Sequence, residues 1–337
     1  MKRWLLRLLL VLAVLSVTAA GALWWARVKI AEPGPSMAPA SVVIPKGTAS
    51  ADIGSLLAEA DVIDHPWLFL LAVRLSGRQP LMAGEYSFPA RASLASIIDM
   101  MHRGQTVVRK LTIAEGLTVF QVLAQMRQTE GLTGNAGQVP EEGSLLPQTY
   151  FFSLGDSREA LLLRMTHAMN EMVDELWRHR APNLALANKV EAIILASVVE
   201  RETAIPEERA HIAAVFFNRL KLHMKLQSDP TVIFALSNAE GTLDRPLTHD
   251  DLAIKSPFNT YLVEGLPAGP ICNPGRASLE AVLHPAASDD LYFVADGGGG
   301  HVFAKTLAEH NRNVGNARHV DSRPDVAPAA KKNKSAH

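Results

Sequence analysis

One segment of the chain places a carboxylate at the end of a mostly apolar helical stripe, an arrangement that suits acid–base chemistry. Residues 194–233 read ILASVVERETAIPEERAHIAAVFFNRLKLHMKLQSDPTVI, and the first part predicts an amphipathic helix. Steps of three and four residues place one set of side chains on a common face: Val190, Ile193, Ser197 and Glu200. A poorly solvated cleft can keep a carboxyl protonated, so Glu200 is the candidate general acid. The alternative is a solvated glutamate, because charged residues are seldom buried without a partner.

The neighbouring acid, Glu202, is expected to play no part in this site. It follows Glu200 at a spacing of two and therefore lies on nearly the opposite side of the helix, so the two cannot act as a pair. We expect Arg201 and Glu202 to face solvent. The helix is expected to end near Thr203, because Pro206 suits the first position of a following helix.

A series of motifs along the chain resembles a known family. In order, the motifs are VVERET, FFNRL, LQSDPTVIFAL, SPFNTYLVEGLPAGPICNPG, HPA and YFVADGGGGHVF. Their order and spacing resemble the endolytic murein transglycosylases of the YceG-like family, over about residues 42–310. The chain departs from the family in LLPQTY, where Gln148 stands at a position that usually carries an acid. This departure weakens any role for a carboxylate there and leaves the main site intact.

The resemblance implies a reaction on peptidoglycan. The family cleaves the β-1,4 bond between N-acetylmuramic acid and N-acetylglucosamine without water, because the muramyl C6 hydroxyl attacks C1 and closes a 1,6-anhydro ring. One carboxyl can protonate the leaving oxygen and then accept the hydroxyl proton. The resemblance carries this role to Glu200. It implies internal cutting of nascent glycan strands, with these strands and the inner membrane as partners and peptidoglycan synthases as further candidates.

The same resemblance points to polar residues that bind the substrate: Asn218, Gln227, Asp229, Asn259, Tyr261 and Asn273. The family places the turn 226–229 and the loop 258–261 beside the acid. Amide side chains both donate and accept, as N-acetyl and hydroxyl groups require. We therefore expect Gln227 and Asn259 to lie in one open cleft with the Glu200 carboxyl.

Several of these residues also have a structural interpretation. Asp229 precedes Pro230 and can cap the next helix. Asn259 and Tyr261 can brace their own loop, and Asn273 suits a turn.

Three other reactive side chains are expected to be structural. Arg219 can pair with a local acid, and His301, after a glycine turn, can be a hydrogen-bonded histidine. The only cysteine, Cys272, is expected to be packed, since no neighbouring base is implied.

Composition and missing motifs exclude other function classes. The net charge is −1 and no basic run with interleaved aromatics occurs, so we expect no nucleic acid partner. The chain lacks HExxH, paired cysteines, GxSxG, SxxK, a dinucleotide fingerprint and a Walker A motif. We therefore expect no metal and no cofactor. Two rivals remain, a muramidase that uses water and a non-enzymatic glycan-binding scaffold.

The N-terminus predicts a membrane anchor. Residues 8–26 carry no charge and are long enough to cross a bilayer. Lys2, Arg3 and Arg7 precede this stretch, and Trp24 and Trp25 lie at its far end. This pattern predicts a single-pass inner-membrane protein with a cytoplasmic N-terminus and a periplasmic catalytic domain. A cleaved signal peptide is the alternative, because VTAAGA offers small residues to a peptidase.

The remaining pattern predicts an α+β protein with several parts, since 48% hydrophobic content can build a sizeable core. The parts are a cytoplasmic tip and anchor (1–30), a Pro-rich linker (31–41), a LysM-like module (42–112), a catalytic domain (113–320) and a disordered tail (321–337). Residues 42–103 resemble a LysM-like βααβ unit, which can bind glycan or serve as a spacer. From residue 107 onward, helices are expected at 118–129, 157–179, 189–203, 206–222 and 230–236, and strands at 107–113, 292–295 and 302–303.

Overall fold

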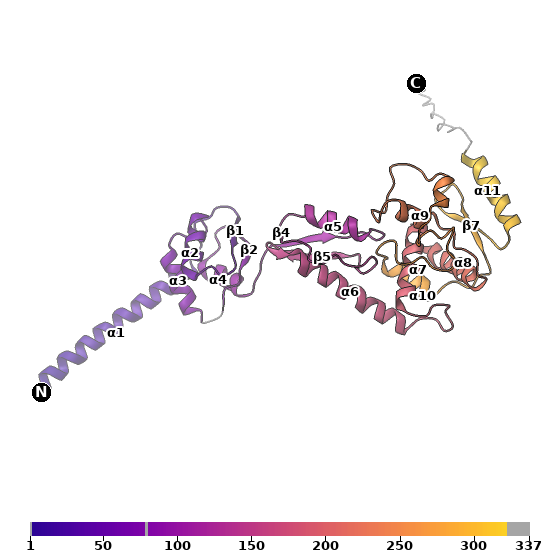
Figure 1. The fold of residues 1–337 in the computed structure, drawn as a ribbon. Coiled ribbons are helices and arrows are strands. Elements are labelled where there is room, and N and C mark those ends of the chain that lie inside the picture. Colours follow the sequence, from indigo (N-terminus) through magenta and orange to yellow (C-terminus); the bar gives the residue numbers. More distant parts are fainter. Residues whose placement is uncertain (1, 78–79, 322–337) are drawn as a thin grey trace, which may run out of the picture. The chain divides into compact units, whose positions relative to one another are not determined.

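The computed structural model describes residues 2–77 and 80–321, which form a mixed α+β fold divided into two units (Figure 1). The first unit consists of Met1–Leu111, Glu130–Thr133 and Phe151–Ser157. The second consists of Thr112–Thr129, Gly134–Tyr150 and Arg158–His337. The mixed α+β class predicted from the sequence is confirmed.

A long apolar helix begins the first unit. Helix α1 (Lys2–Ala31) contains an apolar stretch of 25 residues, Arg7–Ala31, whose most apolar part is not buried against the protein. At about 1.5 Å per residue this stretch exceeds the ~30 Å of a bilayer's hydrocarbon core. An apolar helix without protein partners along most of its length fits the membrane span predicted over 8–26.

The rest of the first unit is a β–α–α–β arrangement followed by one more helix. Its elements are β1 (Ala40–Ile44), α2 (Ser50–Glu59), α3 (Pro66–Leu75), β2 (Gly84–Phe88) and α4 (Leu94–His102). Strands β1 and β2 pair antiparallel, with Val42 opposite Tyr86, and the side chains of Leu57, Phe69 and Ile97 are fully buried between sheet and helices. The element order agrees with the predicted small unit, while its likeness to LysM stays a prediction.

The Pro-rich segment after α1 is hydrogen-bonded to this unit. Gly34 N donates to the Arg91 carbonyl oxygen at 3.3 Å, and Arg91 N donates to the Ser36 carbonyl oxygen at 2.7 Å. A Cβ on Gly34 would lie 2.5 Å from the Ala92 carbonyl oxygen, so this close approach requires glycine. The segment predicted as a spacer, 31–41, is therefore an ordered part of the first unit, and its end already belongs to β1.

Helices dominate the second unit. They are α5 (Val119–Gln128), α6 (Arg158–Arg178), α7 (Lys189–Glu202), α8 (Arg209–Lys221), α9 (Asp229–Leu236), α10 (Arg276–Leu283) and α11 (Leu307–Asp321), with short 3-10 helices η1 (Pro206–Glu208) and η2 (Asp250–Ala253). Strands β7 (Tyr292–Ala295) and β8 (His301–Ala304) form an antiparallel hairpin. The chain also contains β3 (Val108–Thr112) paired with β5 (Thr149–Ser153), and β4 (Leu132–Thr133) paired with β6 (Asp156–Ser157).

Helix α7 lies in the core of the second unit. Asn188 caps its start, because the side-chain oxygen accepts a hydrogen bond from Glu191 N at 3.0 Å. Val198 and Val199 are fully buried in a cluster that also includes side chains of α6, α8 and α10. Helices α7, α8 and α10 lie side by side (Figure 1). The helix ends at Glu202, after which Thr203 adopts an extended backbone.

Most of the elements predicted from residue 107 onward are confirmed. The helices expected at 118–129, 157–179, 189–203 and 230–236 correspond to α5, α6, α7 and α9, and the one expected at 206–222 is divided into η1 and α8. The expected strands correspond to β3, β7 and β8. The sequence did not predict α10 and α11, which are a short helix after a turn and a polar helix. Helix α11 includes Asp321, and the other residues of the predicted disordered tail, 322–337, lie outside the described residues.

Gly34→Ala is expected to destabilise the first unit by about 1–3 kcal/mol, because the added methyl group meets backbone atoms that cannot move freely. Thermal unfolding of the full-length protein, with hydrogen exchange of β1 and β2, measures the effect. Gly315→Ala is the matched control, since nothing lies within 4 Å of a Cβ at that helical position. Equal stability of the two variants would show that the segment after α1 is free to leave the unit.

Candidate functional site

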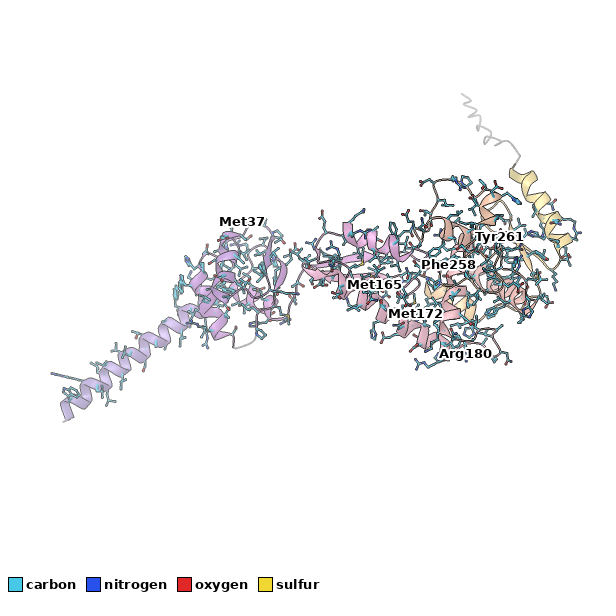
Figure 2. The ribbon with its side chains drawn as sticks, in the orientation of Figure 1. Met37, Met165, Met172, Arg180, Phe258 and Tyr261 are labelled. Carbon is cyan, nitrogen blue, oxygen red and sulfur yellow. The ribbon has the colours of Figure 1, made fainter. Side chains whose placement is uncertain are left out.

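An open pocket in the second unit gathers polar side chains from segments far apart in the sequence. It is lined by the end of α7, the loop before α9, the loop after η2, the β7–β8 hairpin and the start of α11. Its volume is about 440 Å³. The polar side chains that line it include those of Glu202, Gln227, Asp229, Tyr261 and His301. Tyr261 is labelled in Figure 2.

The carboxyl of Glu202 is held inside this pocket by one neutral donor. Its Oε1 accepts a hydrogen bond from Ser228 Oγ at 2.5 Å. Burial raises the pKa of Glu202 to about 7, and Asp229 adds to this rise, while the hydrogen bond from Ser228 and the nearby His301 act in the opposite direction. The carboxyl can therefore remain protonated almost to neutral pH. The expectation that Glu202 faces solvent is wrong, whereas its neighbour Arg201 is exposed as predicted.

Glu202 reaches the pocket because it stands at the end of the face of α7 that packs against the core of the second unit. Val198 and Val199 precede it by four and three positions, so they share its face of the helix, and both are fully buried. Val190, which begins the stripe that ends at Glu200, is 59% exposed. The apolar pair Val198 and Val199 was a hint in the sequence, but only the fold shows that this side of α7, rather than the stripe ending at Glu200, faces the core.

The loop before α9 forms a second wall of the pocket. Gln227 has a φ of 51° and its N–H donates to the Thr260 carbonyl oxygen at 3.1 Å, which fixes the loop while the exposed side chain lines the pocket. Ser228 occupies the position before α9 and Asp229 is the first helical residue, so the capping interpretation of Asp229 is wrong. The Tyr261 hydroxyl instead donates to Asp229 Oδ1 at 2.6 Å. Burial and this carboxylate raise the pKa of Tyr261, which keeps it a hydroxyl donor.

His301 at the start of β8 lines another side of the pocket. The Glu208 carboxylate accepts a hydrogen bond from His301 N at 2.7 Å and lies 2.7 Å from Nδ1, while Thr203 Oγ1 donates to it at 3.1 Å. Although burial acts against it, these hydrogen bonds lower the pKa of Glu208. An ionised Glu208 requires a proton on Nδ1, so Nε2 is the ring nitrogen left for the pocket. The expectation of a hydrogen-bonded His301 is confirmed, and its place in the pocket is an addition.

Glu200 is not among the residues that line this pocket. Its Oε2 accepts a hydrogen bond from Gly275 N at 2.9 Å, just before α10, and its Oε1 lies 3.6 Å from Arg209 Nη2. The side chain is 5% exposed. Burial, together with the charge of Glu200, raises the pKa of neighbouring Glu115. Glu200 as the acid stays a prediction, but these contacts favour a structural role that ties α7 to α10.

Asn259 does not face the pocket. It is fully buried, and its Nδ2 donates to the carbonyl oxygens of Leu252 at 2.9 Å and Ile254 at 2.8 Å. Its Oδ1 accepts from Tyr261 N at 2.9 Å, so Asn259 braces the loop that presents Tyr261. The expectation that Gln227 and Asn259 share one open cleft with the predicted acid is therefore wrong for Asn259.

Asn218 and Asn273 are likewise engaged by the backbone. Asn218 Nδ2 donates to the carbonyl oxygens of Ser288 at 2.8 Å and Asp290 at 3.0 Å. Asn273 is fully buried, and its Oδ1 accepts from Leu145 N at 2.9 Å. Neither residue is among those that line the pocket. Their contacts favour the structural interpretation over substrate binding.

Arg219 also bonds the backbone, although its guanidinium borders the pocket. Its Nε donates to the Leu291 carbonyl oxygen at 2.6 Å, and its Nη1 donates to the Leu226 carbonyl oxygen at 2.8 Å. The guanidinium carbon lies 5.3 Å from the Tyr292 ring centroid. Arg219 thus joins α8 to two walls of the pocket by these contacts rather than by the expected pairing with a local acid.

Two titratable groups are buried away from the pocket. The two carboxylate oxygens of Glu142 accept from Val119 N at 3.0 and 3.1 Å. This hydrogen bond lowers the pKa of Glu142, but burial outweighs it and raises the pKa to about 7. Cys272 is fully buried, with its Sγ donating to the Ser197 carbonyl oxygen at 3.3 Å, and burial raises the pKa of the thiol. The expectation of a packed Cys272 is confirmed.

Known proteins resemble this chain over most of its length. The model of the YceG-like family matches residues 42–316. An endolytic murein transglycosylase from Bacillus subtilis is 34% identical over 304 residues, which cover 81% of this chain and 83% of that protein. One from Streptococcus pneumoniae is 30% identical over 332 residues, which cover 84% of this chain and 59% of the relative. The crystal structure of a YceG-like protein from Listeria monocytogenes is 32% identical, with a TM-score of 0.53, and covers 81% of this chain and 98% of that one.

Asn259→Ala is expected to lower the free energy of unfolding by at least about 2 kcal/mol, because it leaves buried carbonyl groups without their donor. Gln227→Ala is the matched control, since this exposed amide lines the pocket and its loop is fixed by backbone contacts. Chemical denaturation measures both. An Asn259→Ala variant as stable as Gln227→Ala would contradict the bracing role.

Proposed function

Because this chain belongs to the YceG-like family, whose relatives from Bacillus subtilis and Streptococcus pneumoniae are named endolytic murein transglycosylases, we propose that it is a lytic transglycosylase that cuts peptidoglycan strands internally. It cleaves the bond between N-acetylmuramic acid and N-acetylglucosamine in nascent strands, leaves 1,6-anhydro ends and so limits strand length. The observation that carries the proposal is the carboxyl of Glu202, which lies in an open pocket with a pKa of about 7.

Glu202 takes the acid role that the family resemblance first suggested for Glu200. The protonated carboxyl donates its proton to the leaving O4 of N-acetylglucosamine as the bond from C1 to O4 breaks. The 2-acetamido oxygen assists at C1, so a second carboxylate is not required. The Glu202 carboxylate then accepts the proton of the C6 hydroxyl as that oxygen bonds to C1 and the bond from the acetamido oxygen to C1 breaks. The acid is thereby regenerated without water.

The other pocket residues suit the binding and orientation of a sugar. Gln227 offers an exposed amide that both donates and accepts, which matches an N-acetyl group or a hydroxyl pair. Asp229 fixes the Tyr261 hydroxyl and leaves the ring available to a sugar face. His301 also lines the pocket and offers a further polar group there. Gln227 and Asp229 are thus retained as substrate-binding residues together with Tyr261.

We propose in addition that the protein crosses the inner membrane once, with its N-terminus in the cytoplasm and its catalytic unit in the periplasm. Helix α1 is long and apolar enough to span a bilayer, basic residues precede the span, and Trp24 and Trp25 lie near its far end. Nascent glycan strands are made at this membrane surface, so the anchor brings enzyme and substrate together. Peptidoglycan synthases are candidate partners for the same reason, and the LysM-like module is a candidate second contact for the glycan.

Glu202→Gln is expected to lower strand cleavage by at least about a hundredfold, because an amide of nearly the same shape cannot donate and recover a proton. The assay is the release of anhydro-muropeptides from purified sacculi, read by mass spectrometry. Glu200→Gln is the matched control on the same helix, and it should retain most of the wild-type turnover if the variant remains folded.

The two variants separate the possible outcomes. Near-wild-type release by folded Glu202→Gln, with loss in folded Glu200→Gln, would return the acid role to Glu200. Wild-type products heavier by one water than the anhydro form would indicate a muramidase. A wild-type protein that binds sacculi without cutting them would indicate a non-enzymatic glycan-binding scaffold.

The turnover number should fall as the pH rises through about 7, because only protonated Glu202 can donate to the leaving oxygen. Well above this pH the loss approaches about tenfold per pH unit. Asp229→Asn removes a charge that raises the pKa of Glu202, so in this variant the fall in turnover should begin at lower pH. Glu142→Gln is the control, since Glu142 also has a pKa of about 7 but does not line the pocket. If the pH at which turnover falls shifts in Glu142→Gln but not in Asp229→Asn, the assignment of Glu202 as the acid is contradicted.

A further inference from the structure

The first unit contains a second pocket, where α1 joins the β–α–α–β arrangement. We call it the anchor pocket. It is lined by the end of α1, the segment Glu32–Pro35, the loop before α3, the first residues of α3 and the start of α4, and its volume is about 290 Å³. Trp25 and Trp67 form its aromatic wall, and Lys29, Glu32, Asp64 and His65 supply its ionisable groups.

The anchor pocket lies at a defined depth if α1 crosses the membrane. Trp25 lies roughly 27 Å along the helix from Arg7, at about 1.5 Å per residue. The hydrocarbon core of a bilayer is about 30 Å thick, so Trp25 lies where hydrocarbon meets the polar headgroups. Tryptophan is the side chain that prefers this boundary. The pocket therefore opens among lipid headgroups rather than in bulk water.

Contacts between α1 and the unit hold the pocket at this depth. The rings of Trp25 and Trp67 stack with centroids 6.2 Å apart and planes within 4°. Ala26, next to Trp25, is 3% exposed, and Ile30 packs against the hydrophobic core of the unit. The hydrogen bonds of Gly34 fix the segment that follows. The pocket cannot leave the membrane surface without separating these groups.

The ionisable groups of the anchor pocket match a headgroup that carries both charges. Lys29 Nζ lies 2.7 Å from Glu32 Oε2, and both side chains remain partly exposed. Asp64 adds a second exposed carboxylate, and the His65 ring stacks over Trp67 with centroids 6.0 Å apart. Carboxylates and aromatic faces attract an ammonium group, while the ammonium of Lys29 attracts a phosphate. Lys29 balances one of the two carboxylates, so the pocket keeps one carboxylate without compensation, which repels a headgroup that has a phosphate and no ammonium.

We propose that the anchor pocket binds the headgroup of an ethanolamine-type zwitterionic phospholipid, with the lipid ammonium at Glu32 and Asp64, the phosphate at Lys29 and the glycerol region against Trp25 and Trp67. The bound lipid seats the first unit on the outer surface of the membrane. This inference rests on the membrane span of the proposed function, but it does not depend on the identity of the catalytic acid.

Native mass spectrometry of the full-length protein in detergent, titrated with dioleoylphosphatidylethanolamine or dioleoylphosphatidylglycerol, tests the proposal. We expect the ethanolamine lipid to be retained at least about threefold more than the glycerol lipid, the size expected for partly exposed charge pairs. Glu32→Gln combined with Asp64→Asn should abolish this preference. Asp52→Asn combined with Glu59→Gln, which alters exposed acids of α2 outside the pocket, should keep it.

Equal retention of the two lipids by the wild type, or a preference that survives Glu32→Gln with Asp64→Asn, would overturn the lipid site. Digestion of sacculi is measured on the same samples and should be unchanged in that double variant. Loss of the lipid preference with unchanged digestion would show that the anchor pocket acts independently of the catalytic site. A wild-type protein that alkaline carbonate extracts from membranes would instead refute the span on which the proposal rests.

Discussion

The burial of one carboxyl at the end of α7 is the constraint on which the candidate site depends. Burying a carboxylate without strong hydrogen-bond donors costs free energy, so burial favours the protonated form of Glu202. The Ser228 hydroxyl is a neutral donor that orients the group without forcing it to ionise. Asp229 adds a negative charge from the start of α9. The second unit must therefore bring α7, α9 and the β7–β8 hairpin together around one group.

Four buried or half-buried glutamates in the same unit show how partners decide roles. Glu200 is matched by a backbone N–H and Arg209, and Glu208 by donors from His301 and Thr203. These two carboxyls connect elements of the fold. Glu142 is buried with a raised pKa but away from the pocket. Only Glu202, among these, combines a raised pKa with access to the open pocket.

The sequence predicted the elements of the second unit better than it predicted the site. Helix α7 was identified from its periodicity and from Pro206, which suits the start of the following helix, and both are local properties. The choice between Glu200 and Glu202 depended on which face of α7 meets the core, and the mixed stripe ending at Glu200 looked equally apolar. The partners of Asn259 and Asn273 are backbone groups brought near by folding, and residue type alone cannot distinguish such bracing from substrate binding. Gln227, Asp229 and Tyr261 were placed in one pocket because their motifs carried the family's spacing.

The packing of Cys272 has a practical consequence for measuring how the parts of this protein move. Its thiol is the only one in the chain, it is fully buried, and burial disfavours the reactive thiolate. Maleimide and methanethiosulfonate reagents should therefore leave the natural protein unmodified. A cysteine introduced on any exposed surface would then be the sole labelling site. Fluorophores or spin labels in the two units could report interunit distances in a bilayer without first removing a native thiol.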